Sequence, residues 1–254
     1  MSQMSQKSQE SVSIQVDVTT PEWEMRTKVT VPAGPTRLRQ MLPLVQALSD
    51  RIVDATTRAV ESHGDKISCQ KGCGACCRHL VFISEMEARH IRDVIERLPE
   101  PRRTLVRLRF GQARTRLEKA GLIDSLLHPE KWTQQVYQAL ANRYFQQQVA
   151  CPFLEEESCS IHPDRPITCR EYLVTSPAAH CADPTRNPIK RVRLPVRIFN
   201  ALARSDEPST GQFLEAGIPL ILAPEWAEAH PEDPPPRPGP ELLRSLLKNM
   251  RNQE

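Results

Sequence analysis

Long apolar runs are missing from this sequence. A helix that crosses a membrane needs about 20 consecutive, predominantly apolar residues, whereas the most apolar segment, Ile218 to Ala223, contains Pro219 and is followed by Pro224. The first ten residues are rich in Ser and Gln and have neither the apolar core of a secretory signal nor an arginine-rich face. We therefore expect no membrane association and a cytoplasmic location.

The sequence also lacks a strong excess of charge of either sign. Its 34 Lys and Arg residues against 31 Asp and Glu residues give a formal net charge of +3, which is too small to predict electrostatic binding to nucleic acid or to an anionic membrane. Two local basic runs, Arg102 to Arg116 and Arg186 to Arg197, are interpreted as solvated surfaces. No nucleic-acid partner is predicted.

Glycine is scarce, and no glycine-rich loop marks a nucleotide site. Only nine glycines occur among 254 residues, and they do not form the spaced pattern that cradles phosphates. The chain shows no internal repeat and no alternation of strand and helix patterns that would build a parallel sheet. With 39% hydrophobic and 26% charged residues, it has the composition of a soluble globular protein with one main domain.

Apolar periodicity predicts a mainly α, helical single domain with an N-terminal β-hairpin. Apolar residues alternate over 12–18 and 25–31, as they do in half-buried strands. A two-stranded hairpin is marginally stable alone, so we expect it to lie on the helical body or on a partner subunit. Helical spacing predicts helices around residues 38–59, 84–98, 105–120, 132–144, 196–203 and 242–250.

We predict three parts along the chain. Residues 1–11 form a disordered tail, and residues 12–230 form a metal-binding domain that contains cysteine loops 67–79 and 151–181. Residues 231–254 form a proline-rich linker and a C-terminal amphipathic helix.

All the cysteines of the chain fall into two groups. They are Cys69, Cys73, Cys76 and Cys77 in the first group and Cys151, Cys159, Cys169 and Cys181 in the second. Cysteines that serve only packing would be spread over the core elements, whereas these lie in polar segments punctuated by Gly and Pro, where thiolates can converge. In a reducing compartment such thiols favour metal binding over disulfides. We predict that all eight are ligands of zinc or iron, with an iron-sulfur cluster as one form of the centre.

The spacing of the cysteines suits a metal but leaves its arrangement open. Pairs separated by two or three residues let a tight turn bring both sulfurs to one side of a metal ion. Gly72 and Gly74 are expected to supply turn conformations with positive φ and amides that point at sulfur. Either the two loops meet in one joint site, or each loop builds its own four-thiolate site. Cys77 and Cys181 are the weakest ligand candidates, because adjacent side chains diverge and because Cys181 is distant along the chain.

Other side chains near the cysteines have alternative roles. His162 and His180 are candidate replacements for a thiolate ligand. Arg165, Arg170 and Tyr172 are interpreted as residues that support the sulfurs or pair with the carboxylates of Glu171 or Asp164, with binding of an anionic ligand as the alternative.

The order of these motifs resembles a known family. Cys-Gly-Ala-Cys-Cys at 73–77 is followed by Cys-Pro-Phe-Leu at 151–154, Cys-Ser-Ile-His at 159–162, Arg-Pro at 165–166 and Cys-Arg-Glu-Tyr at 169–172. This series looks like the YkgJ-type cysteine-cluster family (CxxCxxCC), a zinc- or iron-chelating domain, and the resemblance covers about residues 67–181. One departure is that three residues, rather than the usual two, separate the first two cysteines.

The resemblance implies metal binding without a defined reaction. Some members of the family are flagellin lysine methylases, so an alternative function is iron-sulfur-dependent group transfer with S-adenosylmethionine. A further alternative is a metal-stabilised adaptor, in which the hairpin and the 242–250 helix bind a protein partner. No catalytic residue is predicted.

Overall fold

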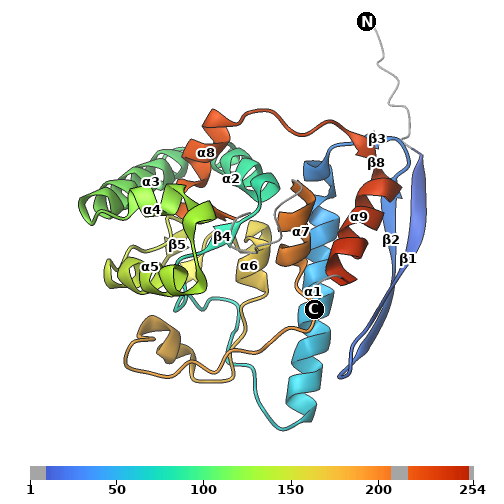
Figure 1. Ribbon diagram of the computed structural model, residues 1–254, viewed down its shortest axis with the longest axis horizontal. Coiled ribbons are helices and arrows are strands. Elements are labelled where there is room, and N and C mark those ends of the chain that lie inside the picture. The colour runs from blue at the N-terminus through green and yellow to red at the C-terminus, as the bar shows by residue number, and fades with distance from the viewer. Residues whose placement is uncertain (1–9, 207–216, 252–254) are drawn as a thin grey trace, which may run out of the picture.

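Helices dominate the computed structural model, which describes residues 10–206 and 217–251 (Figure 1). The α-helices are α1 (Leu42–Ser62), α2 (Glu85–Arg97), α3 (Arg102–Lys119), α4 (Ile123–Leu127), α5 (Gln134–Gln146), α6 (Ile167–Arg170), α7 (Ile198–Asp206), α8 (Ala223–Ala229) and α9 (Gly239–Arg251). The 3-10 helices are η1 (Leu38–Met41), η2 (Pro129–Lys131), η3 (His162–Asp164), η4 (Ala178–Ala182) and η5 (Leu220–Leu222). The predicted mainly α fold is confirmed.

The strands form antiparallel pairs and no larger sheet within the described residues. They are β1 (Ser11–Thr19) with β2 (Glu24–Pro32), β3 (Pro35–Thr36) with β8 (Arg237–Pro238), β4 (Phe82–Ile83) with β7 (Ile218–Pro219), and β5 (Leu154–Glu155) with β6 (Ser158–Cys159). Of the predicted tail, residues 1–9 lie outside the described residues, and β1 already begins at Ser11.

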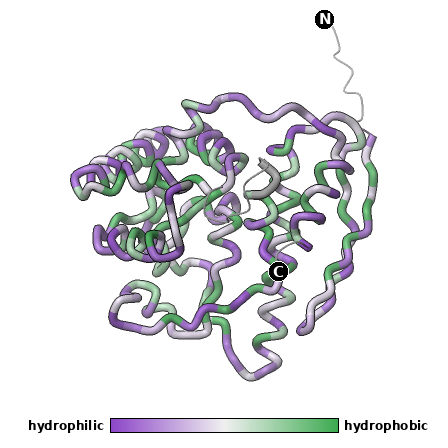
Figure 2. The backbone as a smooth tube through the Cα atoms, in the orientation of Figure 1, coloured by the Kyte–Doolittle hydropathy of each residue, from purple (hydrophilic) through white to green (hydrophobic). Residues whose placement is uncertain are grey.

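The long hairpin packs on the helical body, as expected. Val12 pairs with Val31 and Val18 with Met25, so the alternating apolar side chains of both strands share one face. The β2 strand contacts α1 and α9, and Val16 and Val31 are buried there. Figure 2 shows apolar and polar residues alternating along this hairpin and along α1. Burial against two helices explains why a two-stranded ribbon is stable here.

Two predicted helix boundaries have the expected local causes. Pro43 occupies the first turn of α1, where its missing N–H leaves no hydrogen bond unmade, and Gly64 follows the helix with φ +90°. Ser84 caps α2: its Oγ accepts from Glu87 N at 3.3 Å, and the Glu87 carboxylate accepts from Ser84 N at 2.9 Å. The predicted capping box is confirmed.

Helical spacing predicts that Leu105, Leu108, Ala113, Leu117 and Ala120 form the buried face of α3. Ala113 and Leu117 are buried as predicted, but Leu105 and Leu108 are 43% and 54% exposed, and Val106 and Phe110 are buried instead. The sequence of α3 carries apolar residues on both sides of an arginine-rich helix, so periodicity alone does not identify the buried side. In α5, Val136 is likewise exposed, whereas Trp132 is buried in the connection before the helix.

The C-terminal helix belongs to the core. Its apolar face packs against α7 and β2, and it buries Leu242, Leu243, Leu246 and Met250. These side chains were the predicted partner-binding face of the adaptor alternative, and here the chain itself covers them.

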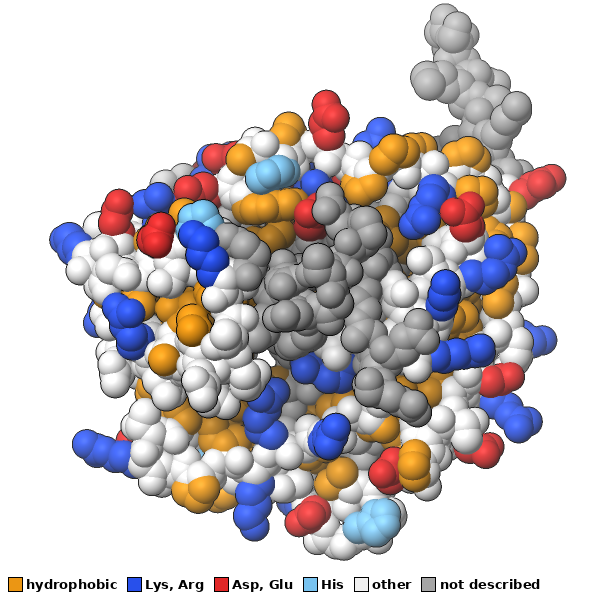
Figure 3. Space-filling view, viewed as in Figure 1, with side chains coloured by type: hydrophobic (Ala, Val, Ile, Leu, Met, Phe, Trp, Pro, Cys, Tyr) orange, Lys and Arg blue, Asp and Glu red, His pale blue; other side chains and the backbone are white. Residues whose placement is uncertain are grey.

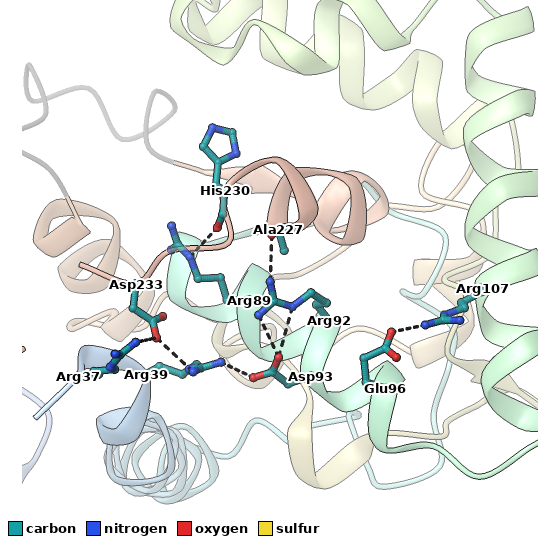
Figure 4. A network of polar contacts seen from close by, with 10 residues as sticks. All are labelled: Arg37, Arg39, Arg89, Arg92, Asp93, Glu96, Arg107, Ala227, His230 and Asp233. Carbon is teal, nitrogen blue, oxygen red and sulfur yellow. Dashed lines mark hydrogen bonds and ion pairs between the residues drawn. The ribbon is translucent and has the colours of Figure 1, made fainter. Parts of the chain in front are cut away.

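Ion pairs hold the proline-rich segment before α9 against the body (Figure 4). Asp233 has a side chain that is only 6% exposed, and it lies 3.1 Å from both Arg37 Nη1 and Arg39 Nη2. Arg39 also pairs with Asp93 of α2, and Arg89 donates to the His230 carbonyl at 3.1 Å. The segment is therefore an ordered strap between α8 and α9. The division of the chain at residue 231 stays a prediction.

The surface has no dominant charge on the side displayed in Figure 3, where basic and acidic side chains are interspersed. None of the described helices combines the length and the apolar character that a bilayer crossing requires.

Candidate metal centre

Backbone hydrogen bonds join the two cysteine loops. The first loop connects α1 to β4, and the second runs from the end of α5 towards α7. Cys151 N donates to the Cys77 carbonyl at 2.7 Å, and Ser68 N donates to the Val174 carbonyl at 2.9 Å. The Arg78 guanidinium adds a two-pronged ion pair to Glu157 at 2.6 and 3.0 Å. Segments more than 70 residues apart in sequence are thus held side by side.

The two predicted glycines serve different purposes in this contact. Gly72 has φ +89°, the left-handed conformation expected from the sequence. Gly74 has no positive φ, but a Cβ added to it would lie 2.4 Å from the Glu157 carbonyl oxygen and 2.5 Å from Leu154 Cδ1. Only a residue without a side chain lets the first loop approach the β5–β6 turn this closely.

A cavity of about 550 Å³ lies where the loops meet. Six thiols line it, from Cys73, Cys76, Cys77, Cys151, Cys159 and Cys169. All eight cysteines of the chain are free, and Cys181 is the buried one among them. No Asp or Glu is among the described residues that line the cavity. The potential metal donors facing it are therefore dominated by sulfur.

Cys76 of the first loop lines the cavity together with three thiols of the second loop, from Cys151, Cys159 and Cys169. Burial raises the pKa of the Cys169 thiol, and the neighbouring Cys151, Cys76 and Cys159 raise it further. Burial also raises the pKa of Cys151 to about 12, with Cys159 and Cys76 again contributing. A hydrogen bond between the side chains of Cys76 and Cys77 is the largest cause of the raised pKa of Cys76. Such thiols resist becoming thiolates unless a positive charge joins them.

Cys69, Cys73 and Cys181 form a second subset of thiols, which interact electrostatically with one another and with Cys76. Burial raises the pKa of Cys69 to about 11, and the nearby Cys76, Cys181 and Cys73 add to the effect. Burial raises the pKa of Cys181 too, opposed by a hydrogen bond with the Tyr172 side chain. Cys69 Sγ donates to the Tyr172 carbonyl at 3.7 Å. Both subsets draw on both loops, which favours one joint site over two self-contained ones.

Three elements fix the short helix α6, which carries Cys169. The buried Glu87 of α2 accepts from Ile167 N at 2.7 Å, and Thr168 Oγ1 donates to the Phe82 carbonyl at 2.7 Å. Arg170 pairs with Asp50 of α1 at 2.7 Å. The hydrogen bonds leave α6 little freedom, so the position of Cys169 is set by α1, α2 and β4 together.

Glu171 and Tyr172, which follow α6, also hold the second cysteine loop in place. Glu171 accepts from the Ile198 and Phe199 amides at the start of α7 and pairs with Arg197 at 3.3 Å. Burial raises the pKa of Glu171 to about 7, although these contacts stabilise the carboxylate and act to lower the pKa. The ring of Tyr172 lies 4.8 Å from the Arg191 guanidinium. Arg170 therefore pairs with a carboxylate, but with that of Asp50 instead of the predicted Glu171 or Asp164. Tyr172 hydrogen-bonds to the Cys181 side chain.

The structure separates the predicted histidine candidates. His162 lines the cavity, whereas His180 does not and instead hydrogen-bonds through Nδ1 to the Pro188 carbonyl at 2.9 Å. His79 also faces the cavity, with Nε2 2.7 Å from the Cys181 carbonyl oxygen. Burial lowers the pKa of both His79 and His162, which favours their neutral forms.

The sequence did not reveal the supporting carboxylates Asp50 and Glu87. Glu87 was recognisable as a helix cap, but its second bond, to Ile167 N, joins positions 80 residues apart and leaves no local pattern. The pairing of Asp50 with Arg170 spans 120 residues.

The donor chemistry fits zinc or iron. Thiolate ligands suit both zinc and iron-sulfur clusters, whereas Mg²⁺ and Ca²⁺ sites are built largely on carboxylates, which are absent from the described residues that line this cavity. Across residues 10–206 and 217–251, no three His, Cys, Asp or Glu side chains already stand in metal-binding geometry.

Comparison with known proteins agrees with this chemistry. Residues 68–187 match the CxxCxxCC family model, described as a putative zinc- or iron-chelating domain. No curated protein and no solved structure gives a significant match to the chain. The matched segment contains both cysteine groups and is similar to the CxxCxxCC domain over that part of the chain.

Proposed function

We propose that this protein binds a zinc or iron centre through thiolates of both cysteine loops, in the reducing environment of the cytoplasm. The observation that supports the proposal is that Cys76 of the first loop lines one cavity together with Cys151, Cys159 and Cys169 of the second loop. Four thiolates are what a tetrahedral zinc site or the cysteine-bound irons of a cluster require. The family description supports metal binding in general.

These four thiols are the proposed primary ligands. Cys69, Cys73 and Cys181 form the second subset beside Cys76 and are proposed to complete a larger centre or to bind a second ion. Cys77 hydrogen-bonds to Cys76 and faces the same cavity, which makes it an additional candidate.

An iron-sulfur cluster is the second candidate for this site. It is favoured by the number of thiols, because the six that line the cavity exceed the four that one zinc ion takes up. The cluster would be held by cysteine thiolates and would supply electron-transfer or Lewis-acid chemistry.

Anaerobic purification followed by elemental analysis and a visible absorption spectrum tests both candidates. Stoichiometric zinc in a colourless protein supports the zinc site and rules out the cluster. Iron with acid-labile sulfide and a broad visible absorption supports the cluster. A folded protein that takes up neither metal when it is reconstituted in reducing buffer contradicts the proposed function.

A further inference from the structure

The cavity beside the thiols is far larger than a metal ion. Its volume is about 550 Å³, whereas a water-sized object occupies about 30 Å³ in the liquid. Pockets that bind small organic molecules typically measure about 300–1,000 Å³. A metal ion held by four sulfurs leaves most of this volume for a second, larger ligand.

Apolar and aromatic side chains also line the cavity. Helix α5 contributes Tyr137, Ala141 and Phe145, and η5 contributes Leu220 and Ile221. This combination of aromatic and aliphatic surface accommodates the apolar body of an organic molecule. It is not needed to hold a metal.

The charged side chains that line the cavity are all arginines. They are Arg165, Arg191 and Arg197, and no acidic side chain accompanies them among the described lining residues. Arg165 serves the sulfurs, because its positive charge lowers the pKa values of Cys76 and Cys159. The other two arginines lie elsewhere on the cavity wall.

Arg191 and Arg197 line the same cavity as Tyr137 of α5. Arg191 stacks on Tyr172 and, in the described part of the chain, has no carboxylate partner. Arg197 is steadied by its 3.3 Å ion pair with Glu171. An exposed arginine stacked at a cavity wall is a suitable anchor for an oxyanion.

We propose that this cavity binds a small organic oxyanion with an aromatic or aliphatic body, whose negative group contacts Arg191 and Arg197 while its body lies against α5. The bound molecule would then lie beside the thiol cluster. The inference concerns a ligand in addition to the metal, and it does not depend on which metal is bound.

Calorimetric titration of the full-length, metal-loaded protein tests this site. Phenyl phosphate combines a ring with an oxyanion, benzyl alcohol has a ring alone, and inorganic phosphate has the charge alone. We expect one molecule of phenyl phosphate to bind per chain, with roughly tenfold or greater loss of affinity for either of the other two probes.

Two variants and one matched control locate the site. Arg191→Gln should weaken phenyl phosphate binding roughly tenfold, because one charge-assisted contact is lost. Ala141→Phe should abolish binding by filling the cavity from α5. Arg193→Gln, at an exposed arginine two residues away that does not line the cavity, should leave binding unchanged.

The proposal is overturned if phenyl phosphate fails to bind, if it binds no better than benzyl alcohol, or if Arg191→Gln and Arg193→Gln have the same effect. Metal content is measured on every sample. Loss of probe binding with full metal content counts against the ligand site alone, and probe binding to a protein that takes up no metal counts against the metal centre alone.

Discussion

At the scale of single residues, Cys76 is the side chain that connects the two cysteine loops chemically. It lines one cavity with the second-loop thiols of Cys151, Cys159 and Cys169, and it also interacts electrostatically with the Cys69 and Cys181 thiols. Its neighbour Cys77 also faces the cavity, and its backbone carbonyl holds the Cys151 amide. The adjacent residues Cys76 and Cys77 thus have different proposed roles: Cys76 is a primary ligand, and Cys77 is an additional candidate.

Replacement of Cys76 by serine should therefore reduce metal affinity by about 100-fold or more, since loss of even a residue that only orients a ligand costs about 10- to 100-fold. Competition with a chromophoric chelator measures the change. Cys77→Ser is the matched control, with an expected loss at least about tenfold smaller. Equal losses in the two variants would show that Cys76 has no central role.

Gly74 decides how closely the loops approach each other. Gly74→Ala should lower the free energy of unfolding by about 1–3 kcal/mol, because the new methyl group would overlap the Glu157 carbonyl and force the loops apart. Urea unfolding of the metal-free protein measures this. Gly34→Ala, where no atom lies within 4 Å of the new Cβ, is the control and should change stability little. A Gly74 variant as stable as the Gly34 variant would contradict the close contact.

At the scale of elements, α6 is too short to be stable alone, and its neighbours hold it in place. A single helical turn of four residues gains almost nothing from its own hydrogen bonds. The carboxylate of Glu87 reaches the N-terminus of α6 from the N-terminus of α2, and Arg170 reaches α1 at Asp50. The position of Cys169 is consequently a property of three helices.

Glu87→Gln should destabilise the protein by about 1–3 kcal/mol and weaken metal binding. The carboxylate uses both oxygens as acceptors, for Ser84 N and Ile167 N, whereas the amide has one acceptor oxygen and leaves a buried group unpaired. Urea unfolding and chelator competition measure the two effects. Glu85→Gln, in a partly exposed pair with Arg89, should cost less than about 1 kcal/mol. A Glu87 variant with unchanged metal affinity would mean that α6 is held independently of α2.

At the scale of the whole molecule, the cysteine loops depend on the metal more than the hairpin and α9 do. The loops have few regular elements, whereas the hairpin, α1, α7 and α9 share buried apolar contacts. Binding free energy at a structural metal site is folding free energy, since the unfolded chain has no preformed site.

Metal removal by a chelator should lower the melting temperature by roughly 10 °C or more, because 1 kcal/mol shifts it by about 2–4 °C in a chain of this size class. Hydrogen exchange should accelerate most at the Cys151 and Ser68 amides, which join the loops. Exchange in the β1–β2 hairpin serves as the internal control and should change least. Uniform acceleration over the whole chain would show that the metal stabilises the body and the loops alike.

Local sequence patterns predicted those elements whose causes are local. The alternation that makes the hairpin, the Ser84 capping box and the Gly72 turn each arise within a few residues, and all three are confirmed. The apolar periodicity of α3 wrongly predicted that Leu105 and Leu108 are buried. Apolar residues lie on two sides of this helix, so their spacing does not reveal which side packs against the core.

The sequence by itself determined a chain rich in helices, with free thiols in two loops and a metal-chelating family signature, because residue type, spacing and caps are local properties. Tertiary structure alone decided which thiols line the same cavity, and that Arg191 and Arg197 line it with them. It also decided that Gly74 is needed because a side chain there would clash with the second loop, and not because the position requires a positive φ. These facts depend on segments about 80 to 120 residues apart meeting in space, and loop-to-loop contacts of that span leave no periodic mark in the sequence.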